Sequence, residues 1–362
     1  MHRTWPGLPA LFRRFTVFFV VVGTASFVIP SVHAGDGGSG PKFSYEGRLD
    51  AVYTSNLFIY SYDRLARFDQ ERLTNPRYRG IDSISDVETR MRFGVNAKWK
   101  MASRRRFLLG VDATKVTYLQ NGIADYTEVG ARARFDTSKR SRWQLDFDQS
   151  IDRFKKNYRM TTNGTNLFAA AILDQTDLRL SYRRGLRGMG SIEGFYGFRD
   201  RSYNAGFEDR GYRGNYLGLI SRYALGRARS KRGWFGKTRA DYGLIDSETG
   251  IDRGVITDRS YRQIRVAQEI GRRFRRGVLR VDLEYRNRTY TTDVVADDAR
   301  YNREDTRYRL RIRVERKLSR VFRLRGVASY SDNLSLRRGN LLTVDETGYN
   351  ELQAGLGLVA RF

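Results

Sequence analysis

The most constraining feature of this chain is a regular alternation between two kinds of connection. Stretches of about a dozen residues, in which apolar and polar side chains alternate, are joined in turn by short basic segments and by long, mostly acidic ones. The short segments hold 20 Lys or Arg and no Asp or Glu, and they are 101–106, 137–142, 183–190, 226–233, 271–276 and 316–320. Short turns on one side and long loops on the other are typical of a closed β-barrel that crosses a membrane.

Period-two patterning is clearest in 278–286 and 307–315. In each segment every second residue is leucine, isoleucine, valine or tyrosine, and most of the intervening residues are charged. A helix would distribute both sets around its axis, so this spacing predicts strands with one apolar and one charged face. Trp99, Trp143 and Trp234 each lie beside a basic segment, as expected for aromatic side chains at the headgroup level of one membrane face.

Counting such segments predicts an all-β fold. We expect a single antiparallel transmembrane β-barrel of about 14 strands, with short periplasmic turns, long extracellular loops and no separate soluble domain. The expected strands are 42–54, 86–100, 106–118, 125–136, 142–154, 175–184, 191–200, 213–225, 234–245, 260–270, 277–289, 306–316, 321–332 and 348–362. Because their number is even, the first strand begins and the last strand ends on the periplasmic side.

The N-terminal 34 residues predict a cleaved secretory signal peptide, which leaves 35–362 as the barrel. Arg3, Arg13 and Arg14 precede an apolar run at 16–29, and small residues near Ala34 supply a cleavage site. The alternative is an N-terminal transmembrane anchor, but the run is shorter than the roughly 20 residues that a spanning helix needs.

The final segment, YNELQAGLGLVARF, alternates apolar and polar residues and ends on Phe362. Here the chain resembles Gram-negative outer-membrane β-barrel proteins of the porin-like type. That resemblance implies an outer-membrane location and recognition of Phe362 by the barrel-assembly machinery. The opening YEGRLDAVYTSNLFIYSYD, at 45–63, is similar to the first strand and loop of barrels associated with exopolysaccharide secretion, which implies a saccharide polymer as the substrate class.

Catalytic and metal-binding residue types are scarce. Both histidines, His2 and His33, fall in the expected signal segment, and the chain has no cysteine. The barrel therefore lacks the usual general base and the preferred zinc ligands, so we expect no enzyme activity, no metal and no cofactor. Carboxylate catalysis by Asp146, Asp148 and Asp152, which share a face of one expected strand, remains an alternative to simple charge balance in the lumen.

A run of four arginines on one strand face is the strongest candidate for a substrate path. Like charges at this spacing repel unless something anionic lies among them. Three hypotheses compete: the run pairs with Asp282 and Glu284 of the preceding strand as a structural lattice, it lines an anion path, or it holds a plug or loop. The expected path residues are Arg307, Arg309, Arg311, Arg313, Arg323, Arg325, Arg280, Arg286, Arg90 and Arg92.

The charges of the two membrane faces differ in sign. The basic turns are expected to anchor the barrel on anionic phospholipid, or to form a funnel that concentrates an anion at the periplasmic mouth. The outer loops are acidic, which allows divalent cations to bridge them to lipopolysaccharide phosphates and favours export of an anion over its uptake. A nucleic-acid partner is excluded, although the isoelectric point is near 10.5, because the basic residues lie on turns of a secreted barrel.

Two functional hypotheses follow. The first is an outer-membrane channel for an anionic solute or polysaccharide, with export of an exopolysaccharide-type polymer as the leading case. The second is a non-conducting structural or assembly barrel that docks a periplasmic secretion partner through its basic turns. Two long loops are expected to cap the lumen or meet a partner: 55–85, which contains a short helical pattern DRLARFDQERL, and 155–174, which contains the apolar LFAAAIL.

Overall fold

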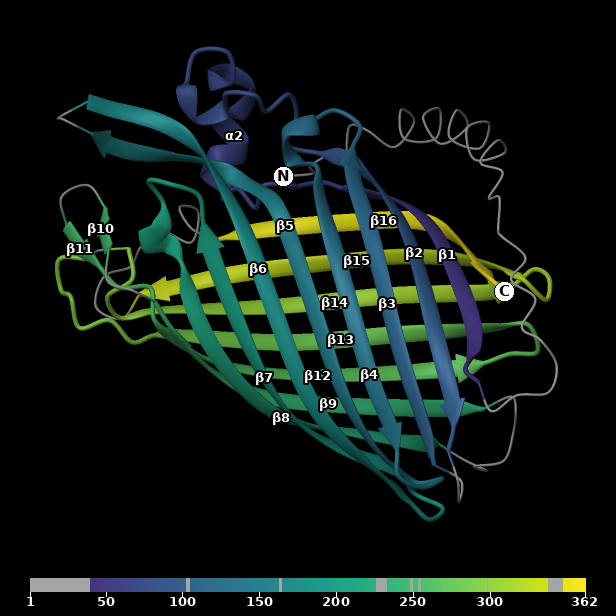
Figure 1. Ribbon diagram of the computed structural model, residues 1–362. Helices are drawn as coiled ribbons and strands as arrows, with labels where there is room; N and C mark the ends of the chain where they lie inside the picture. Colours follow the sequence, from purple (N-terminus) through teal and green to yellow (C-terminus); the bar gives the residue numbers. More distant parts are fainter. Residues whose placement is uncertain are drawn as a thin grey trace. The chain divides into compact units, whose positions relative to one another are not determined.

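A computed structural model describes residues 40–101, 105–162, 165–225, 233–247, 250–252, 255–297, 299–337 and 348–362. Fourteen strands form a closed barrel in which every neighbouring pair is antiparallel (Figure 1). They are β1 (Lys42–Thr54), β2 (Asp86–Lys100), β3 (Arg106–Tyr118), β4 (Tyr126–Asp136), β5 (Ser141–Thr162), β6 (Thr165–Leu186), β7 (Gly190–Tyr203), β8 (Tyr212–Leu225), β9 (Trp234–Asp246), β12 (Tyr261–Arg273), β13 (Gly277–Tyr290), β14 (Arg303–Lys317), β15 (Phe322–Arg337) and β16 (Tyr349–Arg361).

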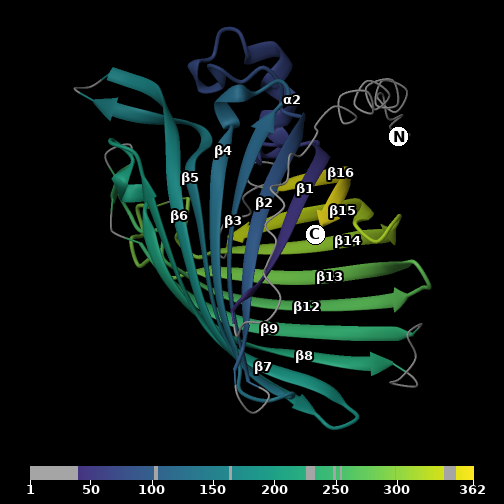
Figure 2. The same cartoon turned by 45° about the vertical axis from the view of Figure 1, so that its right-hand side comes forward.

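The barrel closes between its first and last strands. Glu46 pairs with Arg361 and Thr54 with Gln353, so the start of β1 lies beside the end of β16. Figure 2 shows the same closure from another side. We call the end that holds these two strand termini and the short connections the turn end, and the opposite end the loop end. The predicted fold class and strand order are confirmed, as is the prediction that the first strand begins and the last strand ends on the same side of the barrel.

Apolar side chains face outward around the wall. Leu219 of β8 is 61% exposed, Leu283 of β13 56% and Tyr308 of β14 52%. Side chains alternate between the two faces of a strand, so the charged residues next to Leu283 and Tyr308 in sequence face the lumen. Such a continuous exposed apolar band is unfavourable in water and favourable against lipid. Trp99, Trp143 and Trp234 all lie at the turn end, where they pack beside other aromatic rings or basic side chains; Trp143 stacks 4.7 Å from Tyr182.

The strands β5 and β6 differ from the prediction. The segment 155–174, expected as a loop, continues both strands into a long hairpin that extends beyond the other strands (Figure 1). Register shifts between Ser150 and Arg153, and again between Phe154 and Lys156, mark β-bulges. Each bulge shifts the inward and outward sets by one position, so the period-two pattern disappears where the strand itself continues.

The loop-end connections carry the remaining structure. Helix α2 (Tyr62–Glu71) confirms the helical pattern expected in 55–85, and the 3-10 helix η1 (Pro76–Tyr78) follows it. Two further 3-10 helices are η3 (Gly122–Ala124) and η4 (Glu208–Arg210), and β10 (Gly250–Asp252) and β11 (Val255–Thr257) form a small hairpin. Within the described chain, no helix is both long and apolar enough to cross a membrane. The expected signal segment, 1–34, lies outside the described residues.

Candidate functional site: the lumen wall

All ten predicted path residues face the lumen. On β14, Leu310, Ile312 and Val314 point outward and are 41% to 49% exposed, so the arginines between them line the inside. The cross-strand register places Arg280 and Arg286 of β13, and Arg323 and Arg325 of β15, on the same face. Arg90 and Arg92 lie on β2, which is separated from β15 by β16 and β1. Eight of the ten residues therefore form one patch.

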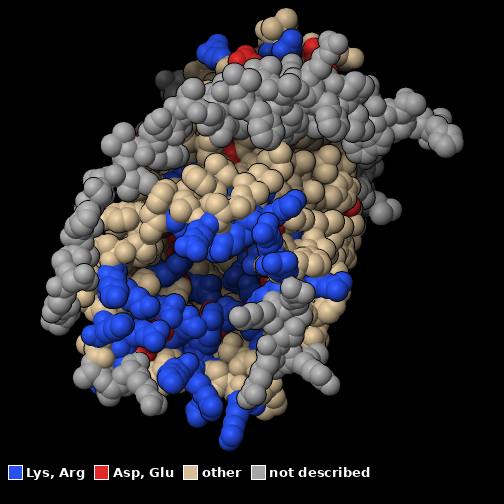
Figure 3. All heavy atoms as spheres, turned by 90° about the vertical axis from the view of Figure 1, so that its right-hand side faces the viewer, with Lys and Arg blue, Asp and Glu red and all other residues tan. Residues whose placement is uncertain are grey.

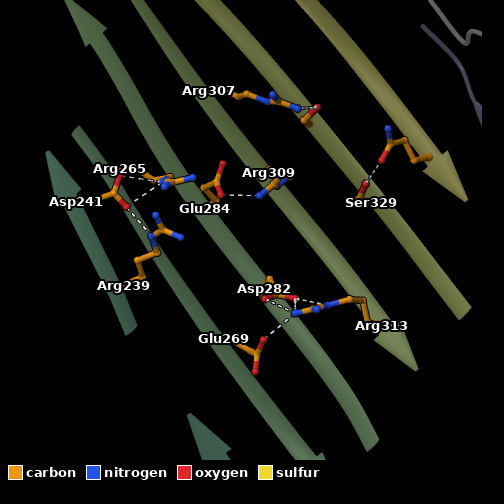
Figure 4. Close-up of polar contacts among 12 residues, drawn as sticks. Arg239, Asp241, Arg265, Glu269, Asp282, Glu284, Arg307, Arg309, Arg313 and Ser329 are labelled. Carbon is orange, nitrogen blue, oxygen red and sulfur yellow. Dashed lines mark hydrogen bonds and ion pairs between the residues drawn. The ribbon is translucent and has the colours of Figure 1, made fainter. Parts of the chain in front are cut away.

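Most of this patch is neutralised by carboxylates of the wall (Figure 4). Arg309 donates to Glu284 at 2.5 Å, and Arg313 lies 2.8 Å from Asp282 and 2.7 Å from Glu269. The other pairs are Arg307 with Glu351, Arg323 with Glu315, Arg280 with Glu269, Arg90 with Glu88 and Arg92 with Asp112. Within the run of four, Arg309 and Arg313 pair with the two acids that the lattice hypothesis named, Glu284 and Asp282. Counting the other acids, seven of the ten residues have a carboxylate partner.

Arg286, Arg311 and Arg325 have no ion pair or hydrogen bond with any described residue. Asp282 lies directly opposite Arg311, yet its carboxylate is engaged by Arg313, two residues along the same strand. The Nε of Arg311 is buried and has no hydrogen-bond partner. Arg286 lies opposite Arg307, another cation. These three guanidinium groups supply positive charge that the described wall does not neutralise.

The lumen contains a cavity of about 480 Å³ that is lined by charges of both signs. The strands β5 and β6 contribute three acids and one base, Asp146, Asp148, Asp177 and Arg179. The strands β9, β12 and β13 contribute four bases and one acid, Arg239, Arg265, Arg286, Arg288 and Asp241. Asp241 accepts hydrogen bonds from Arg239 at 2.7 Å and from Arg265 at 3.0 Å, which holds both side chains against the wall (Figure 4).

The alternative of a carboxylate catalytic cluster loses one member. Asp152 lies after the first bulge of β5, has a φ of 57°, and is exposed. Its backbone N–H donates to Asp174. The bulge removes Asp152 from the lumen-facing set, so the expected shared face with Asp146 and Asp148 is wrong. Asp146 itself is 2.7 Å from Arg132 and accepts from Gln144. The described residues contain no cluster of His, Cys, Asp and Glu that could hold a metal ion.

The loop 55–85 packs into a small hydrophobic core at the loop end. Phe68 of α2 packs edge-on against Tyr78, with ring centroids 5.0 Å apart, and Tyr78 packs edge-on against Tyr60 at 5.7 Å. Phe58 packs edge-on against Phe154 of β5. Asn157 donates two hydrogen bonds from its Nδ2, to the carbonyl oxygens of residues 77 and 79. The extended β5–β6 hairpin thus holds this loop in place.

The mouth at the turn end is strongly basic (Figure 3). Lys and Arg side chains surround a hollow in this face, and few acidic side chains are visible between them. Within the rim, Arg272 lies 5.4 Å from the ring of Trp234, and Arg273 lies 4.5 Å from that of Phe235. The parts of the basic turns at 102–104 and 226–232 lie outside the described residues.

The closed 14-stranded wall, its apolar outer band and the aromatic residues at its turn end are together decisive. The chain is an outer-membrane β-barrel. No family model matches it, and no curated protein sequence matches it significantly.

Among solved structures, the barrel is similar to several outer-membrane proteins. A bacterial polysaccharide outer membrane secretin aligns with a TM-score of 0.42 and 8% identity, over 88% of this chain and 98% of its own. The outer membrane channel DcaP of Acinetobacter baumannii gives 0.45 and 11%, over 90% and 99%. OmpT of Vibrio cholerae gives 0.45 and 9%, over 91% and 99%. At such scores, none of these similarities carries an argument about function.

Three charged residues that face the lumen were not predicted from the sequence. Arg239 and Arg265 were not among the expected path residues, although their strands were placed correctly. Alternation counted from the strand ends would have assigned both to the inner face. Lys155 had no such signal, because it lies in a bulge of β5 where the alternation is broken.

Proposed function

We propose that this barrel is a channel for an anionic solute, with an anionic saccharide or polysaccharide as the substrate class. The observation that carries the proposal is that three of the ten predicted path residues, Arg286, Arg311 and Arg325, have no ion pair or hydrogen bond with any described residue. A guanidinium without a carboxylate partner attracts a mobile anion, whereas a paired one is largely neutralised. Arg286 also lines the cavity, so this charge is accessible to a solute in the lumen.

The polarity of the molecule supports export. The basic mouth at the turn end, which faces the periplasm in the predicted orientation, raises the local concentration of an anion there. The outer loops are rich in acidic residues, which disfavour entry of an anion from outside. The segment 45–63, with its similarity to the start of barrels associated with exopolysaccharide secretion, makes export of an exopolysaccharide-type polymer the leading case.

The test compares the ion selectivity of the parent barrel with that of two variants in planar bilayers. The triple variant Arg286→Gln, Arg311→Gln, Arg325→Gln removes unpaired charge, and its anion selectivity should fall toward none. The matched control Arg309→Gln, Glu284→Gln removes a neutral ion pair from the same wall and should leave selectivity unchanged. Equal selectivity in the parent and the triple variant would rule out these arginines as the anion path.

A second candidate is a non-conducting barrel that docks an acidic periplasmic partner. The basic mouth in Figure 3 favours it, because a dense positive rim suits an acidic protein surface as well as an anion. Reversing charge at Arg187, Arg275 and Arg320, each in a described turn, should abolish capture of such a partner. Recovery of the same periplasmic proteins by the parent and the reversed variant would argue against docking through the turns.

A further inference from the structure

Four cations gather at the loop end of the lumen around Lys155. Lys155 is the extra residue of a bulge in β5: Phe154 pairs with Ile172 and Lys156 with Ala171, so Lys155 has no cross-strand partner. Its side chain lies within electrostatic range of Arg153, Lys156, Arg201 and Arg288, and Tyr212 and Tyr261, the rings under Arg201 and Arg288, lie 6.4 Å apart. Arg201 belongs to β7 and Arg288 to β13, which β8, β9 and β12 separate in the wall. Lys155 therefore projects into the lumen between distant strands.

Neutral groups hold the arginines of this cluster in place. Arg201 donates from Nε and Nη2 to the side-chain oxygen of Gln175, at 3.1 and 2.5 Å, and stacks 4.7 Å from Tyr212. Arg288 donates from Nε to Gln263 at 2.8 Å and stacks 4.7 Å from Tyr261.

Arg153 stacks 4.9 Å from Tyr126. Amides and rings fix the position of a guanidinium but leave its charge uncompensated.

Carboxylates do not neutralise the cluster. None of the four cations forms an ion pair with a described carboxylate. The acidic side chain near Arg288 is Asp305, and Arg303 already engages both of its oxygens, at 2.8 and 3.1 Å, while Tyr290 donates to one of them at 3.3 Å. Farther down the lumen the arginines are mostly salt-bridged, so this cluster differs from the wall below it.

We propose that Lys155, Arg153, Arg201 and Arg288 form a binding site for a phosphate-type oxyanion, free or carried on a saccharide. Converging cations without carboxylate partners repel one another, and a multiply charged oxyanion among them removes that repulsion and accepts several charge-assisted hydrogen bonds. Because Arg288 also lines the central cavity, the site opens onto it. A solute leaving the cavity toward the loop end meets this site.

This inference rests on the proposed function, because it places the phosphate site on the path that anions take through the lumen. The two can nevertheless fail separately, because a barrel can bind phosphate at equilibrium and carry no current. The test is therefore calorimetric titration of inorganic phosphate into the full, folded barrel in zwitterionic detergent micelles. Glucose 6-phosphate, titrated in parallel, distinguishes a site for the free anion from one that prefers an anion carried on a sugar.

The decisive variant is Lys155→Met, which keeps the length of the side chain and removes its charge. We expect its affinity for phosphate to fall about tenfold, the loss of one charge-assisted hydrogen bond. The matched control is Lys115→Met, on the outward face of β3, which should bind like the parent. Circular dichroism establishes that each variant is folded.

Arg201→Lys provides an independent test, because it keeps the charge but loses the fork geometry at Gln175. Arg201→Lys should bind phosphate more weakly than the parent. This variant therefore still tests the site if Lys155→Met does not fold. Absence of phosphate binding to the parent would overturn the proposal, as would an equal loss in Lys115→Met or undiminished binding by the folded Lys155→Met and Arg201→Lys variants.

Discussion

At the scale of single residues, Glu193 has more ion-pair partners than its neighbours in the wall. Its carboxylate lies 2.7 Å from Arg179, 2.7 Å from Arg183 and 2.9 Å from Arg222, and its side chain is 6% exposed. Three partly buried guanidinium groups from β6 and β8 thus depend on one acid of β7. Removing the carboxylate of Glu193 would leave all three guanidinium groups without this partner, and unpaired buried charges destabilise a fold.

Glu193→Gln should therefore destabilise the folded barrel by about 2 kcal/mol. Glu46→Gln is the matched control, since Glu46 has a single partner, Arg361, and both side chains are about one-third or more exposed. The control should change the free energy of unfolding by about 0.5 kcal/mol or less. Guanidinium-induced unfolding followed by tryptophan fluorescence measures both, and equal losses in the two variants would contradict this account of Glu193.

Arg311 and Arg313 are alike in sequence and differ in their partners. Arg311→Gln removes an unpaired charge, so it should lower anion selectivity and leave stability nearly unchanged. Arg313→Gln also frees Asp282 and Glu269, so it should shift selectivity further toward cations and destabilise the barrel by about 1 to 3 kcal/mol. Reversal potentials and unfolding curves test the contrast. Equal selectivity and equal stability of the two variants would show that the ion pairs of Arg313 affect neither property.

The sequence predicted which arginines face the lumen but not which of them are paired. Alternation assigns Arg311 and Asp282 to facing positions, and direct pairing is the simplest expectation. The structure instead pairs Asp282 with Arg313, one step diagonally across the strands. Long side chains reach both the direct and the diagonal neighbour, so the choice depends on three-dimensional geometry and on acids of the next strand, such as Glu269.

At the scale of elements, the packed loop 55–85 should respond to alkaline pH. Tyr60 is fully buried in it, and its hydroxyl has no hydrogen-bond partner. Burial, and then the neighbouring Tyr78, raises the pKa of Tyr60 above its ordinary value. The packed loop therefore keeps the neutral phenol, while a released loop loses the proton above about pH 10. The packed state loses stability as the pH rises beyond that point.

Limited proteolysis of the loop at pH 9 and pH 11 measures this effect. The parent should be cleaved within 55–85 much faster at pH 11, and Tyr60→Phe should be protected from much of that increase. The smaller remainder reflects Tyr78, whose pKa burial also raises. If the parent and Tyr60→Phe opened equally at pH 11, ionisation of Tyr60 would not control the loop.

The sequence predicted individual elements well wherever the period of two is unbroken. Twelve of the fourteen expected strands agree with the structure to within five residues at either end, and α2 was anticipated. The extended part of β5 and β6 was mistaken for a loop, because two bulges change the register. The β10–β11 hairpin was missed because its strands have three residues each, too few for alternation to show.

At the scale of the whole molecule, the charge is arranged in zones along the lumen. The mouth at the turn end is densely basic, the middle is mostly salt-bridged, and the loop end holds the cluster around Lys155. The middle alone would select weakly, because its charges largely cancel. Selectivity for anions therefore depends on the two ends and on the three unpaired arginines between them.

The reversal potential of the unmodified barrel in a potassium chloride gradient tests this account most directly. The protein, refolded without residues 1–34, is inserted into a planar bilayer of neutral lipid, so that lipid charge does not set the sign. We predict a stable conductance whose reversal potential shows chloride to be more permeant than potassium. A potassium-selective pore, or a folded and inserted barrel that carries no current, would contradict the proposal of an anion channel.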